Sequence, residues 1–179
     1  MKSRLIFLPL AGIVLAGGPA YATVYLSVEQ AQAVLFPGAT FQPDMRTLTD
    51  DQAKAIGRAS GVDVRNKQLK AWRVSTGGWF IVDEVVGKHE YIPLAVALDE
   101  NGAVKGIEVL EYREAFGDQI RNPEWRKQFV GKAPGTKLQL EKNIRNVSGA
   151  TLSCKHVTDG VGRLLVTYDL VLKQSNAGH

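Results

Sequence analysis

The sequence contains a single cysteine, Cys154, so no disulfide can form within the chain. One cysteine and three histidines without ligand spacing also give no metal-binding pattern, and we expect no metal. The formal net charge is only +4, and no long basic run is interleaved with aromatic residues. Nucleic acid is therefore not an expected partner. These absences exclude a disulfide-stapled scaffold, a cysteine-histidine metal centre and a basic nucleic-acid-binding surface.

An apolar stretch long enough to cross a bilayer is also lacking. Residues 5–18 are apolar and follow two basic residues, but a spanning helix needs about 20 apolar residues. Residues 20–22 (Ala-Tyr-Ala) have the small-x-small pattern of a signal-peptidase site. We interpret residues 1–22 as a cleaved secretory signal peptide and expect a periplasmic protein. The alternative is a retained anchor in the inner membrane. Residues 23–179 are then a single domain.

Two short helices are predicted in the first third of the chain, over residues 27–35 and 51–59. Ser27 and Gln30 have the spacing of a capping box at the start of the first helix. Gly61 is placed to end the second helix. Both helices are only partly apolar, so we expect them to cover a sheet.

Five segments have the apolar alternation and turn-forming boundaries of strands. They span residues 69–75, 79–86, 91–98, 104–110 and 138–147. Glycine-containing turns separate the first pair and the second pair, which predicts two hairpins. The pattern indicates an α+β fold: a twisted antiparallel sheet of about five strands covered by helices, with a long C-terminal helix.

The C-terminal helix is predicted from apolar residues that recur at steps of three and four. These are Val157, Val161, Leu164, Leu165, Tyr168, Val171 and Leu172. The helix should begin near Ala150 and Thr151, with Ser148 as its cap and Gly149 at a sharp bend. Its free N–H groups and helix dipole favour a phosphate beside Thr151. The alternative is a serine-capped helix start without a ligand.

Two further side chains of this helix are given no chemical role. His156 follows Leu152 by about one turn, and we expect it to face solvent. Cys154 is expected to fill a small space in the core, as a lone helical cysteine usually does.

The turn before the helix reads Ser148, Gly149, Ala150, Thr151, Leu152, Ser153. It resembles the S/T-G-A-T-x-S/T signature of the FMN-binding domain family. This family includes flavin-carrying subunits of the sodium-pumping NADH:quinone oxidoreductase and of the Rnf electron-transport complex. The resemblance implies that FMN is joined through its phosphate to the Thr151 hydroxyl, a phosphothreonine-type linkage. It also implies a separate FAD-dependent flavin transferase that makes the bond.

A second stretch, residues 111–118, resembles the H/S-x-E-T-P-G loop of the same family. Glu114 and Gly117 match that loop, whereas Phe116 is part of the Ala-Phe pair that replaces Thr-Pro. The resemblance implies that the loop passes close to the isoalloxazine ring and that Phe116 packs on the ring edge. The alternative is a polar loop that leads into a helix beginning at residues 123–125.

One position departs from the family pattern. Six residues before the modified threonine the family usually has an acid, and this chain has Arg145. If the transferase reads the acid, FMN is held without a covalent bond. The alternative is that Arg145 lies near the phosphate and helps to neutralise it.

The expected function is that of an exported, membrane-associated flavoprotein that carries electrons through bound FMN. Its donor and acceptor are unknown redox partners, with membrane-bound proteins among the candidates. We expect an electron carrier in preference to a stand-alone enzyme, because flavin chemistry belongs to the cofactor. The alternatives are a non-redox periplasmic binding or assembly protein of the same fold, and a flavin reductase for a small substrate.

Overall fold

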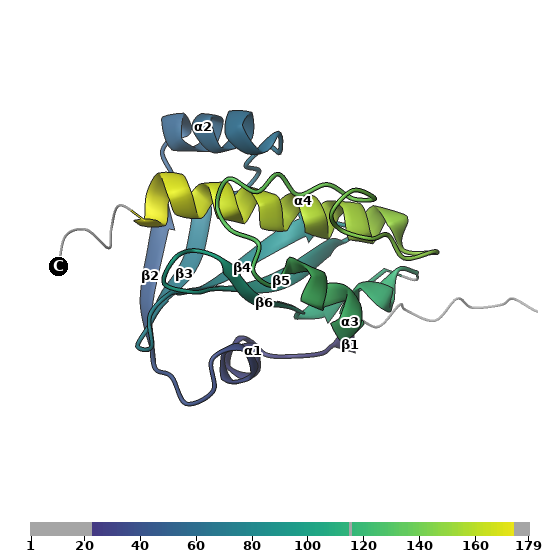
Figure 1. Cartoon of the computed structure of the whole chain (residues 1–179), viewed down its shortest axis with the longest axis horizontal. Coiled ribbons are helices and arrows are strands. Elements are labelled where there is room, and N and C mark those ends of the chain that lie inside the picture. Colours follow the sequence, from purple (N-terminus) through teal and green to yellow (C-terminus); the bar gives the residue numbers. More distant parts are fainter. Residues whose placement is uncertain (1–22, 115, 174–179) are drawn as a thin grey trace, which may run out of the picture.

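The computed structural model describes residues 23–114 and 116–173, which form one layered α+β unit. A five-stranded antiparallel sheet lies between helices on both faces (Figure 1). The predicted signal peptide or anchor, residues 1–22, lies outside the described residues. Within residues 23–114 and 116–173, every helix is too short or too polar to cross a membrane.

The sheet is a simple meander in which each strand pairs with the next along the chain. Its strands are β2 (Phe41–Thr47), β3 (Gln68–Val74), β4 (Trp79–Val86), β5 (Tyr91–Leu98) and β6 (Val104–Val109). The last four confirm predicted strands, because each has apolar side chains that enter the core and a glycine turn beside it. The turn before β6 includes Gly102 at φ +80°, a conformation that favours glycine.

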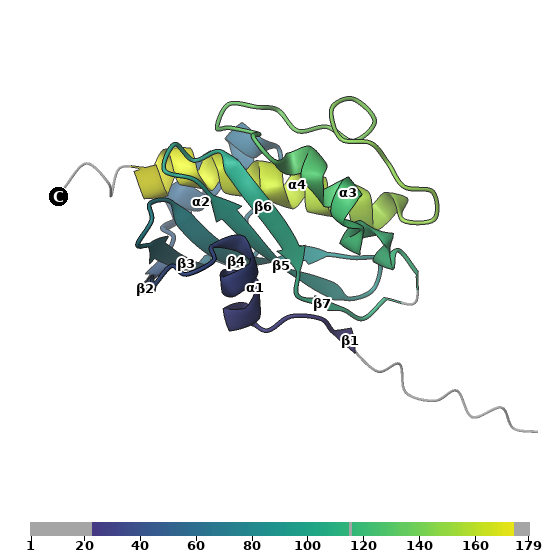
Figure 2. The same ribbon diagram turned by 60° about the horizontal axis from the view of Figure 1, so that its bottom comes forward.

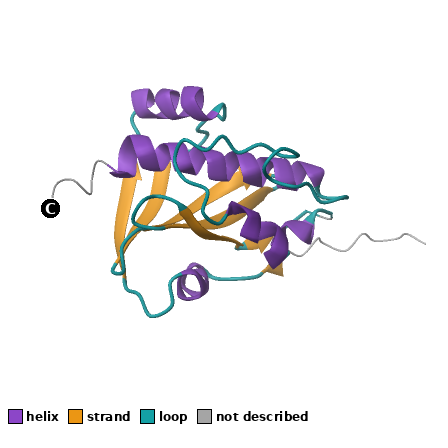
Figure 3. Ribbon diagram, viewed as in Figure 1, coloured by secondary structure: helices purple, strands orange, loops and turns teal. Residues whose placement is uncertain are grey.

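The fifth strand was placed wrongly. Residues 138–147 form turns and a single isolated bridge between Leu140 and Ile144 (Figure 3). At the start of β6 the free edge pairs with another segment, since Val104 exchanges backbone hydrogen bonds with Gly131 and Lys132. The actual fifth strand is β2, which pairs with β3 at the opposite edge. Its side chains are mostly exposed, so it has little apolar alternation.

Both predicted short helices are confirmed, with their caps. Helix α1 (Val28–Leu35) begins with a capping box between Ser27 and Gln30. Helix α2 (Asp50–Ser60) begins with a capping box at Thr49 and ends at Gly61, which has φ +73°. The two helices lie on opposite sides of the sheet (Figure 1).

The long helix α4 (Thr151–Thr167) continues into a π-helical turn, η3 (Tyr168–Leu172). All seven apolar residues of the predicted stripe are buried against the sheet, which confirms that face of the helix. A second, smaller core lies under α1 and includes Phe36 and Phe80. Apolar burial therefore holds helices on both faces of the sheet.

The segments around the start of α4 come from distant parts of the chain (Figure 2). Strand β1 (Thr23–Val24) pairs with β7 (Glu111–Tyr112) in a separate two-stranded ribbon. After β7 the chain forms η1 (Asp118–Arg121), the predicted helix α3 (Pro123–Arg126) and η2 (Lys127–Phe129). This route brings the loop after β7 against the first turn of α4.

Candidate functional site

Helix α4 begins at an open turn. Gly149 has φ +84°, which makes the sharp bend that was predicted there. The N-cap residue is Ala150, and no side chain caps the helix, so the prediction of Ser148 as the cap is wrong. The first N–H groups of an α-helix have no partner within the helix. They are available here for an external acceptor.

Thr151 is exposed at this turn, and its hydroxyl accepts a hydrogen bond from Asn146. Asn146 Nδ2 donates to Thr151 Oγ1 at 2.9 Å, while Asn146 Oδ1 accepts from the Val147 N–H at 2.8 Å. Because the Val147 N–H must face an oxygen, the second bond fixes which side of the Asn146 amide is Oδ1 and which is Nδ2. The first bond leaves the Thr151 hydroxyl proton unused. Asn146 therefore orients Oγ1 without consuming its proton.

The loop after β7 is clamped to the first turn of α4 by one tyrosine. Tyr112 donates its hydroxyl hydrogen to the Phe116 carbonyl at 2.6 Å, and its oxygen lies 2.8 Å from Ser153 Oγ. A phenol has a single hydrogen, so Ser153 is the donor in the second bond. Ser153 is buried and belongs to the motif turn. The two sequence landmarks thus meet through Tyr112.

Gly117 is the residue that permits this close approach. Its φ is +101°, and a Cβ at this position would lie 2.5 Å from Tyr112 Oη and 2.7 Å from Ser153 Oγ. Any side chain would therefore push the loop away from α4. The close packing of the loop against α4 therefore explains why this position is a glycine.

Glu114 binds a neighbouring turn. Its Oε1 accepts hydrogen bonds from the His89 N–H at 2.6 Å and the Glu90 N–H at 3.0 Å. Burial raises the pKa of Glu114, but these backbone donors outweigh it, so its pKa lies below the ordinary value. The carboxylate is therefore held ionised at the base of the loop.

Two apolar side chains of the predicted site are open to solvent. Phe116 is 83% exposed at the tip of the loop, and Leu152 is 48% exposed on the first turn of α4. They are two of the exposed large apolar side chains in the described residues, and both lie beside the motif turn.

Arg145 is exposed, and its backbone joins it to the core. Its N–H donates to Gln128 Oε1 at 2.8 Å, and its carbonyl accepts from Trp125 Nε1 at 2.7 Å. These bonds hold the chain just before Asn146 in place.

His156 differs from its prediction. It is partly buried, and its Nδ1 atom is buried without a hydrogen-bond partner among the residues that the structure describes. The side chain lines a cavity of about 470 Å³ between α4, the end of β4 and the loop after α2. Cys154 is fully buried, as predicted, and burial raises the pKa of its thiol.

The start of α4 fits a phosphorylated ligand. The uncapped first turn and the Thr151 hydroxyl suit a phosphate group.

Two functional candidates were missed by sequence reasoning: Asn146 and Tyr112. Asn146 stands next to the motif, but a hydrogen bond to Thr151 depends on the turn at Gly149. Tyr112 and Ser153 are 41 positions apart, so no local pattern joins them. Only the folded chain shows these contacts.

Part of the chain matches a known protein family. Residues 87–166 match the family model described as the FMN-binding domain. The matched range contains the loop after β7 and extends through the motif turn into α4. The chain matches none of the curated proteins with which it was compared.

Proposed function

Because the chain carries an FMN-binding domain, we propose that it is an exported electron carrier with FMN joined to Thr151 through a phosphoester. The observation that supports this most directly is the exposed Thr151 hydroxyl at the uncapped start of α4. Asn146 donates to that oxygen and keeps it directed out of the turn. A nucleophilic hydroxyl beside free N–H groups suits transfer to a phosphate.

The bond would be made by a separate flavin transferase that uses FAD. Thr151 Oγ1 attacks the phosphorus on the FMN side of FAD, the pyrophosphate bond breaks, AMP leaves, and the hydroxyl proton is released. The first-turn N–H groups stabilise the charge of the attached phosphate. Arg145 replaces the usual acid of the family pattern, and its exposed side chain is available to the transferase.

An electron carrier needs its cofactor close to a surface that partners can reach. The exposed side chains of Phe116 and Leu152 flank the motif turn and give such a surface an apolar rim. FMN, when bound, supplies reversible uptake and release of electrons; the chain supplies its position and solvent access. We propose that donor and acceptor dock at this rim in turn.

Export is proposed from the N-terminal sequence, and its test is the N-terminus of the mature protein. Mass spectrometry of protein purified from the periplasm should give a chain beginning at or near Thr23. An intact Met1 in a washed membrane fraction would favour the retained anchor.

The attachment site is tested by co-expression with a flavin transferase, followed by denaturing electrophoresis viewed by flavin fluorescence. Thr151→Val keeps the shape of the side chain and removes the nucleophile, so the fluorescent band should disappear while the protein stays folded. Thr151→Ser keeps a hydroxyl and should retain part of the band. Thr47→Val is the matched control, since it makes the same change at an exposed threonine of strand β2, outside the motif, and should leave the band unchanged.

The outcomes separate the rival functions. A band of equal strength in Thr151→Val would place the bond elsewhere. A wild-type protein without a band but with yellow, extractable FMN would keep the carrier and remove the covalent bond. A colourless native protein would favour the non-redox binding or assembly role. Rapid turnover of a small substrate by the isolated flavoprotein would favour a reductase.

A further inference from the structure

Residues 131–145, which we call the basic strap, lie between η2 and the motif turn. The strap has one acidic residue, Glu141, and four cationic residues: Lys132, Lys137, Lys142 and Arg145. Four positive charges less one negative charge give it a formal charge of +3. The whole chain carries only +4, so this short segment accounts for much of the net charge.

The four cations of the strap have no ion-pair partner among the residues that the structure describes. Elsewhere in the described part of the chain, nine cationic side chains pair with a carboxylate. Asp159, the acid of α4, already pairs with Lys155 at 2.5 Å. Like charges repel one another, so these four cations do not stabilise the fold through ion pairs of their own.

The strap presents its charges from an ordered backbone. Ile144 is fully buried and fixes the segment to the main core. Asn143 Nδ2 donates to the Lys137 carbonyl at 2.9 Å and closes a turn within the strap. Lys137, Lys142 and Arg145 are exposed. A partner would therefore meet these charges on a segment that does not have to become ordered on binding.

The strap leads to the start of α4, where it runs beside that helix (Figures 1 and 2). Residues 135–140 and α4 line a cavity of about 560 Å³. Of the four cations only Lys137 lines it, so the strap does not gather its charges around one small anion. The last cation, Arg145, precedes Asn146, which donates to Thr151 Oγ1. The charges thus extend along a surface that ends at the proposed flavin site.

We propose that the basic strap is the docking surface for a redox partner protein that has acidic residues around its own redox group. The inference rests on the proposed function, because it takes Thr151 as the place of the flavin. The strap attracts and orients the acidic partner, and the exposed Phe116 and Leu152 side chains give the close apolar contact. A lipid headgroup takes up no electrons, so cations that lead to the flavin site favour a protein partner over an anionic membrane.

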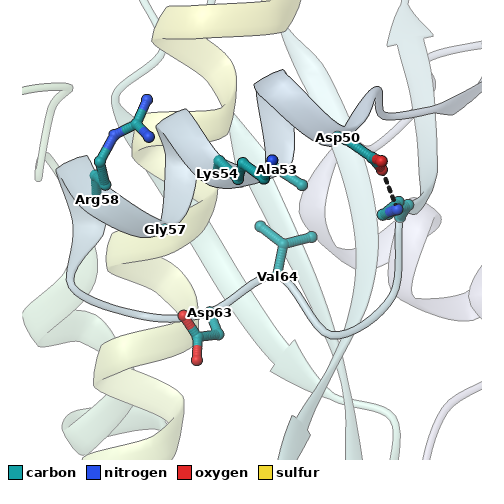
Figure 4. A pocket seen from close by; sticks show the side chains of 8 residues that line it. Asp50, Ala53, Lys54, Gly57, Arg58, Asp63 and Val64 are labelled. Atoms are coloured by element: carbon teal, nitrogen blue, oxygen red, sulfur yellow. Dashed lines mark hydrogen bonds and ion pairs between the residues drawn. The ribbon is translucent and has the colours of Figure 1, made fainter.

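Lys54 on α2 and Lys70 on β3 give a matched control. Both are exposed and, like the strap cations, have no ion-pair partner in the described residues. Figure 4 shows Lys54 on α2 among the residues that line a separate cavity of about 600 Å³. Lys70 lines a further cavity between β3 and β4. Neither lysine lines the cavity between the strap and α4.

The test uses the full-length protein loaded with FMN by the transferase, and a reduced, acidic [2Fe–2S] ferredoxin as the electron donor. Each ferredoxin gives one electron, so two ferredoxins and two protons from solvent reduce one FMN. Stopped-flow absorbance follows this reduction. The second-order rate should fall about tenfold between about 20 and 200 mM salt, because salt screens the attraction.

The double variant Lys137→Glu/Lys142→Glu should lower this rate about tenfold at low salt. The control double variant Lys54→Glu/Lys70→Glu changes the net charge equally and should change the rate by less than about twofold. With cytochrome c, a basic electron acceptor, the strap variant should not be slower than the wild type. Flavin content is measured by mass spectrometry and folding by thermal melting. If the strap variant does not fold, Lys137→Gln/Lys142→Gln replaces it.

Equal slowing by the two double variants would show an effect of net charge alone and overturn the proposal. A rate that responds neither to salt nor to the strap variant would also overturn it. Vesicles of phosphatidylglycerol and phosphatidylcholine test the membrane alternative. Vesicle binding that is lost in the strap variant, with ferredoxin rates unchanged, would show that the strap binds lipid.

Binding of oxidised ferredoxin, measured by calorimetry, separates this inference from the proposed function because it requires no flavin. If the wild-type protein takes up no FMN, the carrier function fails. Ferredoxin binding that is weakened only by the strap variant would still support the strap as a surface for acidic proteins. If the wild-type protein carries FMN but the strap variant changes neither binding nor rate, only this inference fails.

Discussion

Tyr112 Oη lies 2.8 Å from Ser153 Oγ and joins the loop after β7 to the first turn of α4. The same phenol donates to the Phe116 carbonyl, so the Tyr112 side chain bonds both to the loop after β7 and to α4. The position of the loop relative to Thr151 therefore depends on Tyr112.

Tyr112→Phe should destabilise the protein by about 1–3 kcal/mol, because the change leaves the buried Ser153 hydroxyl without its hydrogen-bond partner and removes the bond to the Phe116 carbonyl. Urea unfolding measures the loss. Hydrogen exchange should show faster opening of residues 116–118. Tyr91→Phe is the matched control, since Tyr91 is 53% exposed and its change should leave stability within error. Equal effects of the two changes would show that the clamp contributes nothing.

The same residue predicts a loss of stability in alkali. Burial raises the pKa of Tyr112 above its ordinary value of 10.0. The hydrogen bond with Ser153 lowers this pKa, whereas repulsion from Glu114 and Asp118 raises it further. The folded chain thus holds this proton more tightly than the unfolded chain, so the stabilisation is complete below pH 10.0 and is lost as the pH rises through the folded-state pKa. Burial also raises the pKa values of Cys154 and Tyr168. Above pH 10.0 the free energy of unfolding should therefore fall more for the wild type than for Tyr112→Phe. The difference between the two proteins is the contribution of Tyr112.

Gly117→Ala should be costly for two reasons: a positive φ and a collision with the clamp. We expect a loss of at least about 2 kcal/mol, since backbone strain alone costs about 1–3 kcal/mol. Gly131→Ala is the matched control. Gly131 has φ +78° with open space around it, so an alanine there adds backbone strain without a collision. A Gly117→Ala protein no less stable than Gly131→Ala would contradict the close approach.

Asn146→Ala should slow attachment of FMN to Thr151 while leaving the fold intact. Losing the hydrogen bond that orients Oγ1 should reduce the initial rate by roughly tenfold, equivalent to about 1.4 kcal/mol in the barrier. The rate is followed by in-gel flavin fluorescence with purified transferase. Asn143→Ala is the control: Asn143 supports the same irregular segment by bonds to Gln139 and Lys137 but does not contact Thr151. Equal slowing in both variants would point to a general disturbance of the segment.

Leu164→Ala should cost about 2–5 kcal/mol, because Leu164 is 3% exposed within the main core. Leu170→Ala, at 37% exposure in the following turn, should cost much less. Thermal and denaturant unfolding provide the comparison. Flavin content per folded molecule should not change in either variant. An unchanged melting curve for Leu164→Ala would mean that the buried face of α4 was assigned wrongly.

Local patterns were sufficient for most elements of the fold. Strands β4 and β5 have long apolar runs between glycine or polar turns, and the stripe on α4 has a clear helical period. Residues 138–147 were wrongly predicted as a strand because their apolar residues anchor an irregular segment to the core. Ile144 is fully buried although no strand forms there. Strand β2 has no apolar alternation from which it could be predicted. Its backbone pairing with β3 holds it in place while its side chains stay mostly exposed.

The candidate site was predictable only in part, for the same reason. Thr151 and Gly149 were found because a helix start and a bend are local features. The Tyr112–Ser153 contact arises from packing between segments far apart in the chain. Helical periodicity places His156 beside Leu152 but does not say what covers it.

The exposure of Thr151 has a consequence for the order of events in maturation. Its oxygen lies outside the core, between an intact helix and a segment fixed by Ile144 and by the Trp125–Arg145 hydrogen bond. A bulky group added there displaces no buried side chain. If FMN is attached to Thr151 as proposed, the attachment can therefore follow folding, and the transferase would meet Thr151 in the folded chain.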